Sequence, residues 1–452
     1  MSTRNSPKPG QSLGGGLVLL PSDAVPSSTE SFSLYKAYSL ADRAFWLEPG
    51  LVSDAMTRLN LLRMDDIHQL QVLTVAEISD TLNNLELPHR FLHKRLVHNL
   101  RAGALHGLIA KQCSLSEKEI AVGVLAECMH DNFTCAGGDS WKGINHQQTI
   151  FDEDDQFAEK IFRYYNPGWR WLCLKHGFNP EHTAQEMQEI VDGHGLRGQI
   201  HEIADTASYM LGDLAEIKKA HERVGGLKFQ EIILASEDKD NKWDIWNHLK
   251  VEAGQLVATD RWVLENFLRL RVMLWKNLYQ NPATKFLELL GREVVYPYLL
   301  SRKRIHLVEL PKQTDTWLHN LVEQEMGLAS GGWTRLDLLG GFPKLKSFRT
   351  WGEAREFEDY WYSLGAFTLV FSVKDFQKTK SKTDKYLING LDGEVVAFKQ
   401  ACPTSAALID EVARWSTSSS EPINVCWVEN PIIPDNMRRA WEEARVLWQN
   451  RK

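Results

Sequence analysis

The chain has 452 residues, with 52 Lys and Arg against 59 Asp and Glu, so its formal net charge is −7 and its pI is about 6.1. This balance excludes a generally basic nucleic-acid coat protein, although it leaves room for a local basic groove. Hydrophobic residues make up 43 % of the chain without a run of 18 apolar residues, so the sequence predicts a globular protein that lacks a membrane span.

The first part of the chain is expected to be a disordered tail followed by a helical domain. Residues 1–30 are rich in Ser, Pro and Gly and cannot bury enough apolar area to offset the entropy of an ordered chain. Residues 31–310 are predicted to be a helical domain, because apolar residues recur there at three- and four-residue intervals. The clearest helical segments are 90–111, 117–130 and 199–214.

Local signals mark where these helices begin and end. Ser116 and Glu119 have the spacing of a capping box, which predicts the start of the second helix. Two loops are expected, at 132–150 with its Gly-Gly pair and at 165–181 with its Asn-Pro-Gly and Asn-Pro sequences.

Residues 311–452 differ in pattern and are predicted to form a smaller α+β lobe, so the fold class is mostly α with this lobe at the C-terminus. Asn-Gly and Asp-Gly pairs predict a hairpin at 387–398. The other predicted elements are strands at 366–373 and 423–428 and helices at 405–415 and 436–449. The basic stretch 374–385 is interpreted as a solvated loop, with a phosphate or partner contact as the alternative.

Histidine is distributed unevenly, since twelve of the 15 lie between residues 68 and 221. Imidazole is the commonest metal ligand and acid–base group, so this region is the first place to look for chemistry. The pair His130-Asp131 ends a predicted apolar helix, His98 lies 32 residues upstream, and Asp205 lies 74 residues downstream.

The predicted helix 199–214 carries polar residues at four-residue intervals. His201, Asp205, Tyr209 and Asp213 fall on one slowly drifting stripe beside an apolar face. This pattern predicts one wall of a polar cleft, and the alternative is an ordinary solvated outer face.

The set His98, His130-Asp131 and Asp205, in this order and spacing, resembles the HD-domain phosphohydrolase superfamily. Over roughly residues 40–300 the chain resembles the deoxynucleoside triphosphate triphosphohydrolases of the sterile-alpha-motif/HD type and the bacterial dGTPases. The resemblance implies an HD-domain helical core in which these four residues hold a divalent metal ion, with Mn, Mg, Fe, Co, Ni and Zn all open. Such an ion lowers the pKa of bound water and polarises a phosphoryl oxygen.

The resemblance also implies substrate-binding residues. The Arg-x-x-His segment places Arg95 on the substrate phosphates, and the later Arg-x₇-Tyr segment adds Arg271 and Tyr279. The Asp-x₃-Tyr…Asp helix implies that Tyr209 and Asp213 hold the deoxyribose. Bidentate guanidinium groups suit a polyanionic triphosphate.

Several positions depart from the family pattern. Thr134 and Asp139 stand where the family has histidines, Asp152-Glu153 replaces a His-Glu pair, and Thr206 replaces a phosphate-contacting lysine. Asp139, Asp152 and Glu153 are therefore the candidate catalytic carboxylates. They could transfer protons with raised pKa values, bind a second divalent ion, or mark a site that binds nucleotides without turnover.

Two further histidines lie near this constellation. His146, in the same loop as Asp139, is an alternative acid–base group, with an exposed loop histidine as the ordinary interpretation. His201 lies one helical turn before Asp205 and is interpreted as a residue that supports the metal ligands from behind.

The sequence thus predicts an enzyme, a metal-dependent phosphohydrolase acting on nucleotides, with deoxynucleoside triphosphates as the favoured substrates. An HD nucleotidase or phosphodiesterase acting on mono-, cyclic or oligonucleotides is the runner-up, and a nucleotide sensor or scaffold is the alternative of another class. The expected partners are the substrate and a nucleotide effector, with homo-oligomerisation implied by the resemblance and no membrane or nucleic-acid partner. Six cysteines without a Cys-x-x-Cys pair predict a cytoplasmic location.

Overall fold

The structure is a computed structural model, and it describes residues 12–14, 17–20, 37–40, 43–47, 50–68, 76–80, 85–89, 93–141, 156–224, 227–238, 242–275, 278, 286, 288–329, 344–372, 382–390, 393–415 and 423–449. Over these residues the chain is mostly α-helical with a few small sheets, which confirms the predicted fold class.

Helices form most of the described part of residues 50–329. They are α1 (Leu51–Arg58), α2 (Arg95–Gln112), α3 (Glu117–Met129), α4 (Phe157–Lys175), α5 (Pro180–Val191), α6 (Gly195–Val224), α7 (Leu227–Glu237), α8 (Arg261–Leu274), α10 (Tyr296–Ser301) and α11 (Asp315–Met326). Between them lie the short 3₁₀ turns η2 (Leu61–Asp66), η4 (Gly138–Trp141), η7 (Ile245–Asn247) and η10 (Leu307–Lys312), and the π-turn η9 (Leu290–Val295).

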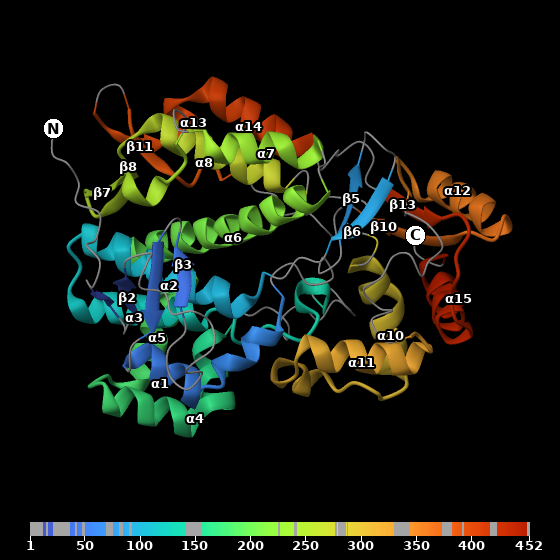
Figure 1. Ribbon diagram of the computed structural model, residues 1–452, viewed down its shortest axis with the longest axis horizontal. Helices are drawn as coiled ribbons and strands as arrows, with labels where there is room; N and C mark the ends of the chain where they lie inside the picture. The colour runs from blue at the N-terminus through green and yellow to red at the C-terminus, as the bar shows by residue number, and fades with distance from the viewer. Residues whose placement is uncertain are drawn as a thin grey trace.

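Helix α6 runs through the middle of the molecule (Figure 1). It packs against α2 and α5 on one side and against α7 and strand β8 (Gln255–Ala258) on the other. Because α6 has neighbours on both sides, its polar stripe is largely enclosed: His201 and Asp213 are buried, and Asp205 and Tyr209 are half-buried. The predicted polar stripe therefore faces the interior, and its alternative interpretation as a solvated outer face is wrong.

Residues from distant parts of the chain share one mixed sheet, in the order β12-β11-β8-β7. Strand β7 (Leu249–Glu252) forms a hairpin with β8, and β11 (Leu387–Asn389) forms a hairpin with β12 (Val395–Ala397). The two hairpins join through β11, which lies parallel to β8 with Leu387 opposite Val257. The residues on either side of the predicted boundary at 310 thus contribute to the same sheet, and helix α14 (Pro403–Trp415) packs on α8.

The rest of the C-terminal part is built on a three-stranded antiparallel sheet. Its order is β10-β13-β9, with the fully buried β13 (Ile423–Val428) between β10 (Phe367–Ser372) and β9 (Lys344–Phe348). Helix α12 (Trp351–Ser363) covers this sheet. Helix α15 (Asp435–Gln449) is tied to β10 by Trp441 Nε1, which donates to the carbonyl of Thr368 at 2.7 Å.

The remaining described elements are short. A sheet in the order β1-β2-β4-β3 joins β1 (Ser12–Gly14), β2 (Leu17–Leu20), β4 (Arg43–Leu47) and β3 (Ala37–Leu40), β5 (Ala76–Asp80) pairs with β6 (Leu85–His89), and α13 (Phe398–Ala401) follows β12. The division of the chain into tail, helical domain and lobe stays a prediction.

Most of the expected elements are confirmed, and the prediction of one loop is wrong. The hairpin at 387–398, the two buried strands and the two C-terminal helices lie where their patterns place them. The loop expected at 165–181 is wrong, because α4 continues as a helix through Pro167 to Lys175. The Asn-Pro signal was informative only at Asn179, whose side chain caps α5 with Pro180 at its first position.

Helices α2 and α3 approach each other closely. The capping box is present, since the Ser116 side chain accepts from Glu119 N and the Glu119 side chain accepts from Ser116 N. Further along α3, Gly123 faces the ring of His106 on α2, and a Cβ added at Gly123 would stand 2.1 Å from His106 Nε2. Only glycine permits this approach, which holds His106 against the buried Glu127.

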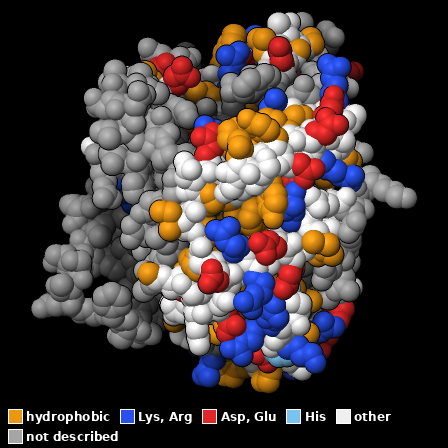
Figure 2. Space-filling view, turned by 90° about the vertical axis from the view of Figure 1, so that its right-hand side faces the viewer, with side chains coloured by type: hydrophobic (Ala, Val, Ile, Leu, Met, Phe, Trp, Pro, Cys, Tyr) orange, Lys and Arg blue, Asp and Glu red, His pale blue; other side chains and the backbone are white. Residues whose placement is uncertain are grey.

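Figure 2 shows the face on the right-hand side of Figure 1, where apolar patches are separated by acidic and basic side chains. Among the described residues of α12 and α15, exposed apolar side chains include Tyr360 and Leu447. No helix in the described part of the chain is both long and apolar enough to span a membrane.

We expect Gly123→Ala to lower the free energy of unfolding by about 2 kcal/mol or more, because the added methyl group displaces the ring of His106 from a packed interface. Urea denaturation followed by circular dichroism would measure this. Gly352→Ala in α12 is the matched control, since the nearest atom to its added Cβ is 3.9 Å away and the change should stay below about 1 kcal/mol. Equal stability of the two variants would contradict the close packing of α2 and α3.

Candidate metal centre

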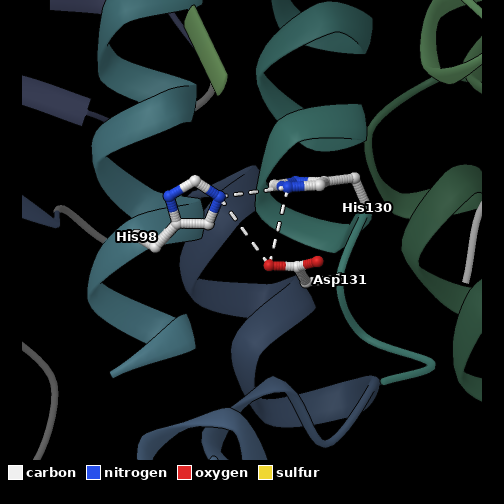
Figure 3. Close-up of side chains that lie close together, drawn as sticks. All are labelled: His98, His130 and Asp131. Atoms are coloured by element: carbon white, nitrogen blue, oxygen red, sulfur yellow. Dashed lines mark hydrogen bonds and ion pairs between the residues drawn. The ribbon is translucent and has the colours of Figure 1, made fainter. Parts of the chain in front are cut away.

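Four predicted ligands meet between α2, α3 and α6. His98 lies on α2, His130 and Asp131 follow the end of α3, and Asp205 lies on α6. The two imidazoles and the Asp131 carboxylate point toward one another (Figure 3). His98, His130 and Asp131 each offer a ligand atom within 4.8 Å of the others, and all three are buried.

The spacing of the donor atoms suits a divalent ion. His98 Nε2 lies 3.3 Å from His130 Nε2, and Asp131 Oδ2 lies 3.7 Å and 3.6 Å from these two nitrogens. Asp205 Oδ1 lies 3.1 Å from His98 Nε2 and 3.4 Å from His130 Nε2. Ligands held about 2.1 Å from one ion lie roughly 3.0–3.4 Å apart, so small shifts would bring the four donors into coordination.

The charges of the centre also suit a cation. Burial alone would raise the pKa of Asp131, but the charge of Arg95 and the imidazoles outweigh it and lower that pKa. Burial would also raise the pKa of Asp205, but hydrogen bonds from His130 and His98 outweigh it and hold that pKa well below its usual range. Both carboxylates are therefore ionised at neutral pH, and Asp205, whose side chain is 29 % exposed, is the ligand that solvent reaches.

Arg95 holds the Asp131 carboxylate rather than facing open solvent. Its Nη1 donates to Asp131 Oδ1 at 2.5 Å, and both side chains are buried. The contact leaves Asp131 Oδ2 directed at the imidazoles, so in this structure Arg95 orients a candidate metal ligand. Its predicted contact with substrate phosphates stays a prediction.

A buried carboxylate behind the centre was not singled out by the sequence analysis. Glu127 Oε1 accepts from His106 Nδ1 at 2.8 Å, and Glu127 Oε2 accepts from His201 Nδ1 at 3.0 Å. The Glu127 carbonyl accepts from His130 Nδ1 at 2.7 Å, which fixes the ring so that Nε2 is the nitrogen directed at the centre. Glu127 therefore links α2, α3 and α6, and His201 supports the centre from behind, as its position one turn from Asp205 suggested.

The predicted substrate residues fall into two groups. Arg271 Nε donates to Tyr209 Oη at 2.8 Å, so α8 and α6 bring these two together. Asp213 is fully buried and accepts from His93 Nδ1 at 2.9 Å, while Arg101 Nη1 lies 3.4 Å from His93 Nε2. Burial and the charge of Arg101 hold the pKa of His93 well below its usual value, so this imidazole is neutral. The deoxyribose contact of Asp213 stays a prediction.

The candidate catalytic carboxylates lie largely beyond what the structure describes. Asp139 belongs to η4, but its side chain is outside the described part, and Asp152, Glu153, His146 and Tyr279 lie outside the described residues altogether. Their roles stay predictions. Two substituted positions are described. The Thr134 side chain is buried, with no hydrogen-bond partner for its hydroxyl, and Thr206 accepts from Lys382 Nζ at 3.2 Å.

A separate cavity of about 230 Å³ lies between α6 and the mixed sheet. Apolar side chains such as Ile203, Leu249 and Leu256 line it, with Glu202 and Lys385 among its polar residues. None of the four metal donors lines this cavity, so it neighbours the centre along α6 without containing it.

Weak local signals could have identified the missed residues. Glu127 is the one carboxylate in the apolar second half of its helix, three residues before the His-Asp pair. His93 precedes the predicted Arg-x-x-His segment by two residues. Lys382 offered only its place in a basic stretch, and nothing local connects it with α6.

The fold described above is similar to that of a solved structure. One solved structure with this fold is a phosphohydrolase from Bacteroides thetaiotaomicron, to which the chain is similar with a TM-score of 0.58 and 14 % sequence identity, over 87 % of this chain and 100 % of that one. The likeness concerns the fold. No protein-family model and no curated protein matches the sequence.

We expect Asp131→Ala to abolish tight binding of Mn²⁺, because it removes a ligand and leaves Arg95 without its buried carboxylate. Arg95→Gln should weaken binding by about 10–100-fold, the usual effect of losing a group that orients a metal ligand. Metal analysis and calorimetric titration would measure both. Asp65→Ala, at an exposed pair with Lys94, is the control; unchanged binding in Asp131→Ala would refute the ligand assignment.

Stability should depend on pH through Glu127. Burial would raise its pKa, but the charge of His201 and the two hydrogen bonds outweigh it and lower the pKa from 4.5 to about 2. A lowered pKa stabilises the fold fully above about 4.5, and this contribution is lost as the pH falls toward 2. The difference in unfolding free energy between wild type and Glu127→Gln should therefore shrink between pH 4.5 and 2, as denaturant titrations would measure. A constant difference would contradict the ionised Glu127.

Proposed function

We propose that the protein is a metal-dependent phosphohydrolase of the HD type that acts on nucleotides, with deoxynucleoside triphosphates as the favoured substrates. The observation that carries the proposal is the convergence of two imidazoles and two ionised carboxylates from three helices on one point. Mixed nitrogen and oxygen donors suit a transition-metal ion that keeps open positions for water and substrate.

The metal centre would act on one phosphorus of the substrate. A bound divalent ion there would activate water and polarise a phosphoryl oxygen. His98, His130, Asp131 and Asp205 would hold that ion, and Arg95 would keep Asp131 in the ligating orientation. Asp139, Asp152 and Glu153 are the carboxylates proposed to orient or deprotonate the water.

The substrate would extend from the centre along α6. Tyr209 lies one turn beyond Asp205, and its hydroxyl already holds the Arg271 guanidinium at 2.8 Å. Arg271 would bind phosphate oxygens, Tyr279 is proposed as a further substrate contact, and Tyr209 would pack against the sugar. A tyrosine in that place would disfavour a 2′-hydroxyl by steric contact, which supports deoxynucleotides over ribonucleotides.

One observation favours the runner-up function, an HD nucleotidase or phosphodiesterase. Asp213, the residue expected to accept from the 3′-hydroxyl, is enclosed with His93 and fully buried. A substrate that does not need this contact would fit the centre without rearranging α6. The substrate range is therefore the main point for experiment.

We expect the protein to hydrolyse deoxynucleoside triphosphates when it is supplied with Mn²⁺, Mg²⁺, Co²⁺ or Ni²⁺. The test is a panel of deoxy- and ribonucleoside mono-, di- and triphosphates, cyclic nucleotides and short oligonucleotides, with products identified by mass in ¹⁸O-labelled water. Labelled tripolyphosphate means a cut at the α-phosphorus, and labelled orthophosphate means single-phosphate release. Asp131→Ala is the control and should show background rates.

Three outcomes separate the alternatives. Turnover confined to monophosphates, cyclic nucleotides or oligonucleotides would establish the nucleotidase or phosphodiesterase function instead. Tight nucleotide binding without any turnover, under all four ions, would establish the sensor or scaffold. If the protein shows neither turnover nor binding with any member of the panel, nucleotides are contradicted as the substrate class.

A further inference from the structure

A lysine from the C-terminal part of the chain reaches the helix that carries Asp205. Lys382 Nζ donates to Thr206 Oγ1 at 3.2 Å, and Thr206 directly follows Asp205 in the sequence. The Lys382 side chain is only 17 % exposed, although it carries an ammonium group. An ammonium that is largely withdrawn from water needs negative charge nearby, so its position requires an explanation.

Part of that negative charge comes from Glu202, one turn before Thr206 on α6. Glu202 Oε2 lies 3.0 Å from Lys382 Nζ, and Glu202 Oε1 accepts from Lys385 Nζ at 2.6 Å. Glu202 is therefore shared by two ammonium groups. If Lys382 turned to another anion, Lys385 would still neutralise Glu202, so the second lysine leaves the first available for a ligand.

A second cation adds to this charge. Arg271 is close enough to Lys382 for its positive charge to oppose that of the ammonium, and Arg271 also donates to Tyr209 Oη. With Lys382, Lys385 and Arg271 against Glu202 and the neighbouring Asp205, the groups along this part of α6 still carry an excess of positive charge. Excess positive charge in a partly buried place attracts polyanions.

An unsatisfied hydroxyl lies in the same cluster. Tyr386 is buried, and its hydroxyl has no hydrogen-bond partner with acceptable geometry. The positive charges of Lys382 and Arg271 both act on this hydroxyl, and Thr206 lies beside it. A buried donor without an acceptor costs free energy, and a phosphate oxygen would supply the acceptor.

The fold holds these groups in place. Lys382 begins a turn in which its carbonyl accepts from Lys385 N at 3.0 Å, and the chain then enters β11, which pairs in parallel with β8. Thr383 Oγ1 donates to Asp410 on α14 at 2.8 Å. Because β8 packs on α6, the pairing of β11 with β8 carries the lysine to Thr206.

We propose that Lys382, Arg271, Tyr386 and Thr206 form a phosphate-binding cradle next to the metal centre, which holds the phosphate groups that follow the one at the metal. This proposal deepens the proposed function and rests on it for the location of the attacked phosphorus. Thr206 is adjacent to Asp205 and Tyr209 lies one turn, about 5 Å, further along the helix, so the cradle is within reach of a linked phosphate chain. The ligand class is therefore an oligophosphate, either free or attached to a nucleoside.

The test measures by calorimetry how tightly the full chain, with saturating Mg²⁺, binds inorganic tripolyphosphate and orthophosphate. Lys382→Gln should weaken tripolyphosphate binding about tenfold or more, because it removes a charge-assisted hydrogen bond, and should change orthophosphate binding less than twofold. Lys385→Gln is the comparison variant, since it removes an equal charge from the same Glu202 but no proposed contact with the ligand. It should therefore weaken tripolyphosphate binding by clearly less than Lys382→Gln does.

Tyr386→Phe separates binding from folding. It removes a hydroxyl whose contact with Thr206 has poor hydrogen-bond geometry, so the melting temperature should change little, while tripolyphosphate binding should weaken several-fold. If Lys382→Gln fails to fold, Tyr386→Phe and Lys382→Arg decide, and the arginine variant should retain most of the affinity. A non-hydrolysable α,β-imido deoxynucleoside triphosphate distinguishes a free oligophosphate from one attached to a nucleoside. If this analogue binds more tightly than bare tripolyphosphate, the ligand is a nucleotide.

The cradle is refuted if Lys382→Gln binds tripolyphosphate as the wild type does, if it loses both anions equally, or if Lys385→Gln loses as much. None of these readouts requires turnover. A wild type that hydrolyses nothing but shows the expected differences in tripolyphosphate binding would overturn the proposed function and leave the cradle standing. Turnover without those differences would do the reverse.

Discussion

The burial of ionised carboxylates between α2, α3 and α6 is the constraint on which the rest of the structure depends. Removing the charge of Asp131 or Glu127 from water costs several kcal/mol unless it is balanced. Arg95 and the imidazoles balance Asp131, while His106 and His201 balance Glu127. Because the partners of Glu127 come from the two other helices, all three helices must hold their mutual positions for its charge to be satisfied.

The same requirement explains why several histidines near the centre are not proposed metal ligands. Of the histidines described near the centre, His106 and His201 donate hydrogen bonds to Glu127, and His93 donates one to Asp213. The histidine excess therefore identified the right region, but among the described histidines only His98 and His130 present nitrogens to the proposed metal. The others stabilise the charges that position those two.

Periodic patterns and local signals were sufficient for most of the helices and for the hairpin at 387–398, since these depend on neighbouring residues. They failed at 165–181, where the packing of an amphipathic helix outweighs the Asn-Pro-Gly sequence and carries α4 through Pro167. They also missed the parallel pairing of β11 with β8, because the two strands are separated by more than a hundred residues and neither strand's sequence indicates its partner.

By itself the sequence determined the mostly helical class and the ends of several helices, because spacing along a chain decides which side chains share a helix face. Its resemblance to the HD-domain phosphohydrolases implied the four candidate metal donors. Only the tertiary structure decided that Arg95 holds Asp131, that Asp213 is enclosed with His93, and that Lys382 stands beside Thr206. The reason is that a buried charge is satisfied by whichever opposite charge the packing brings within a few ångströms. That partner can come from any point in the chain, so neither composition nor spacing identifies it.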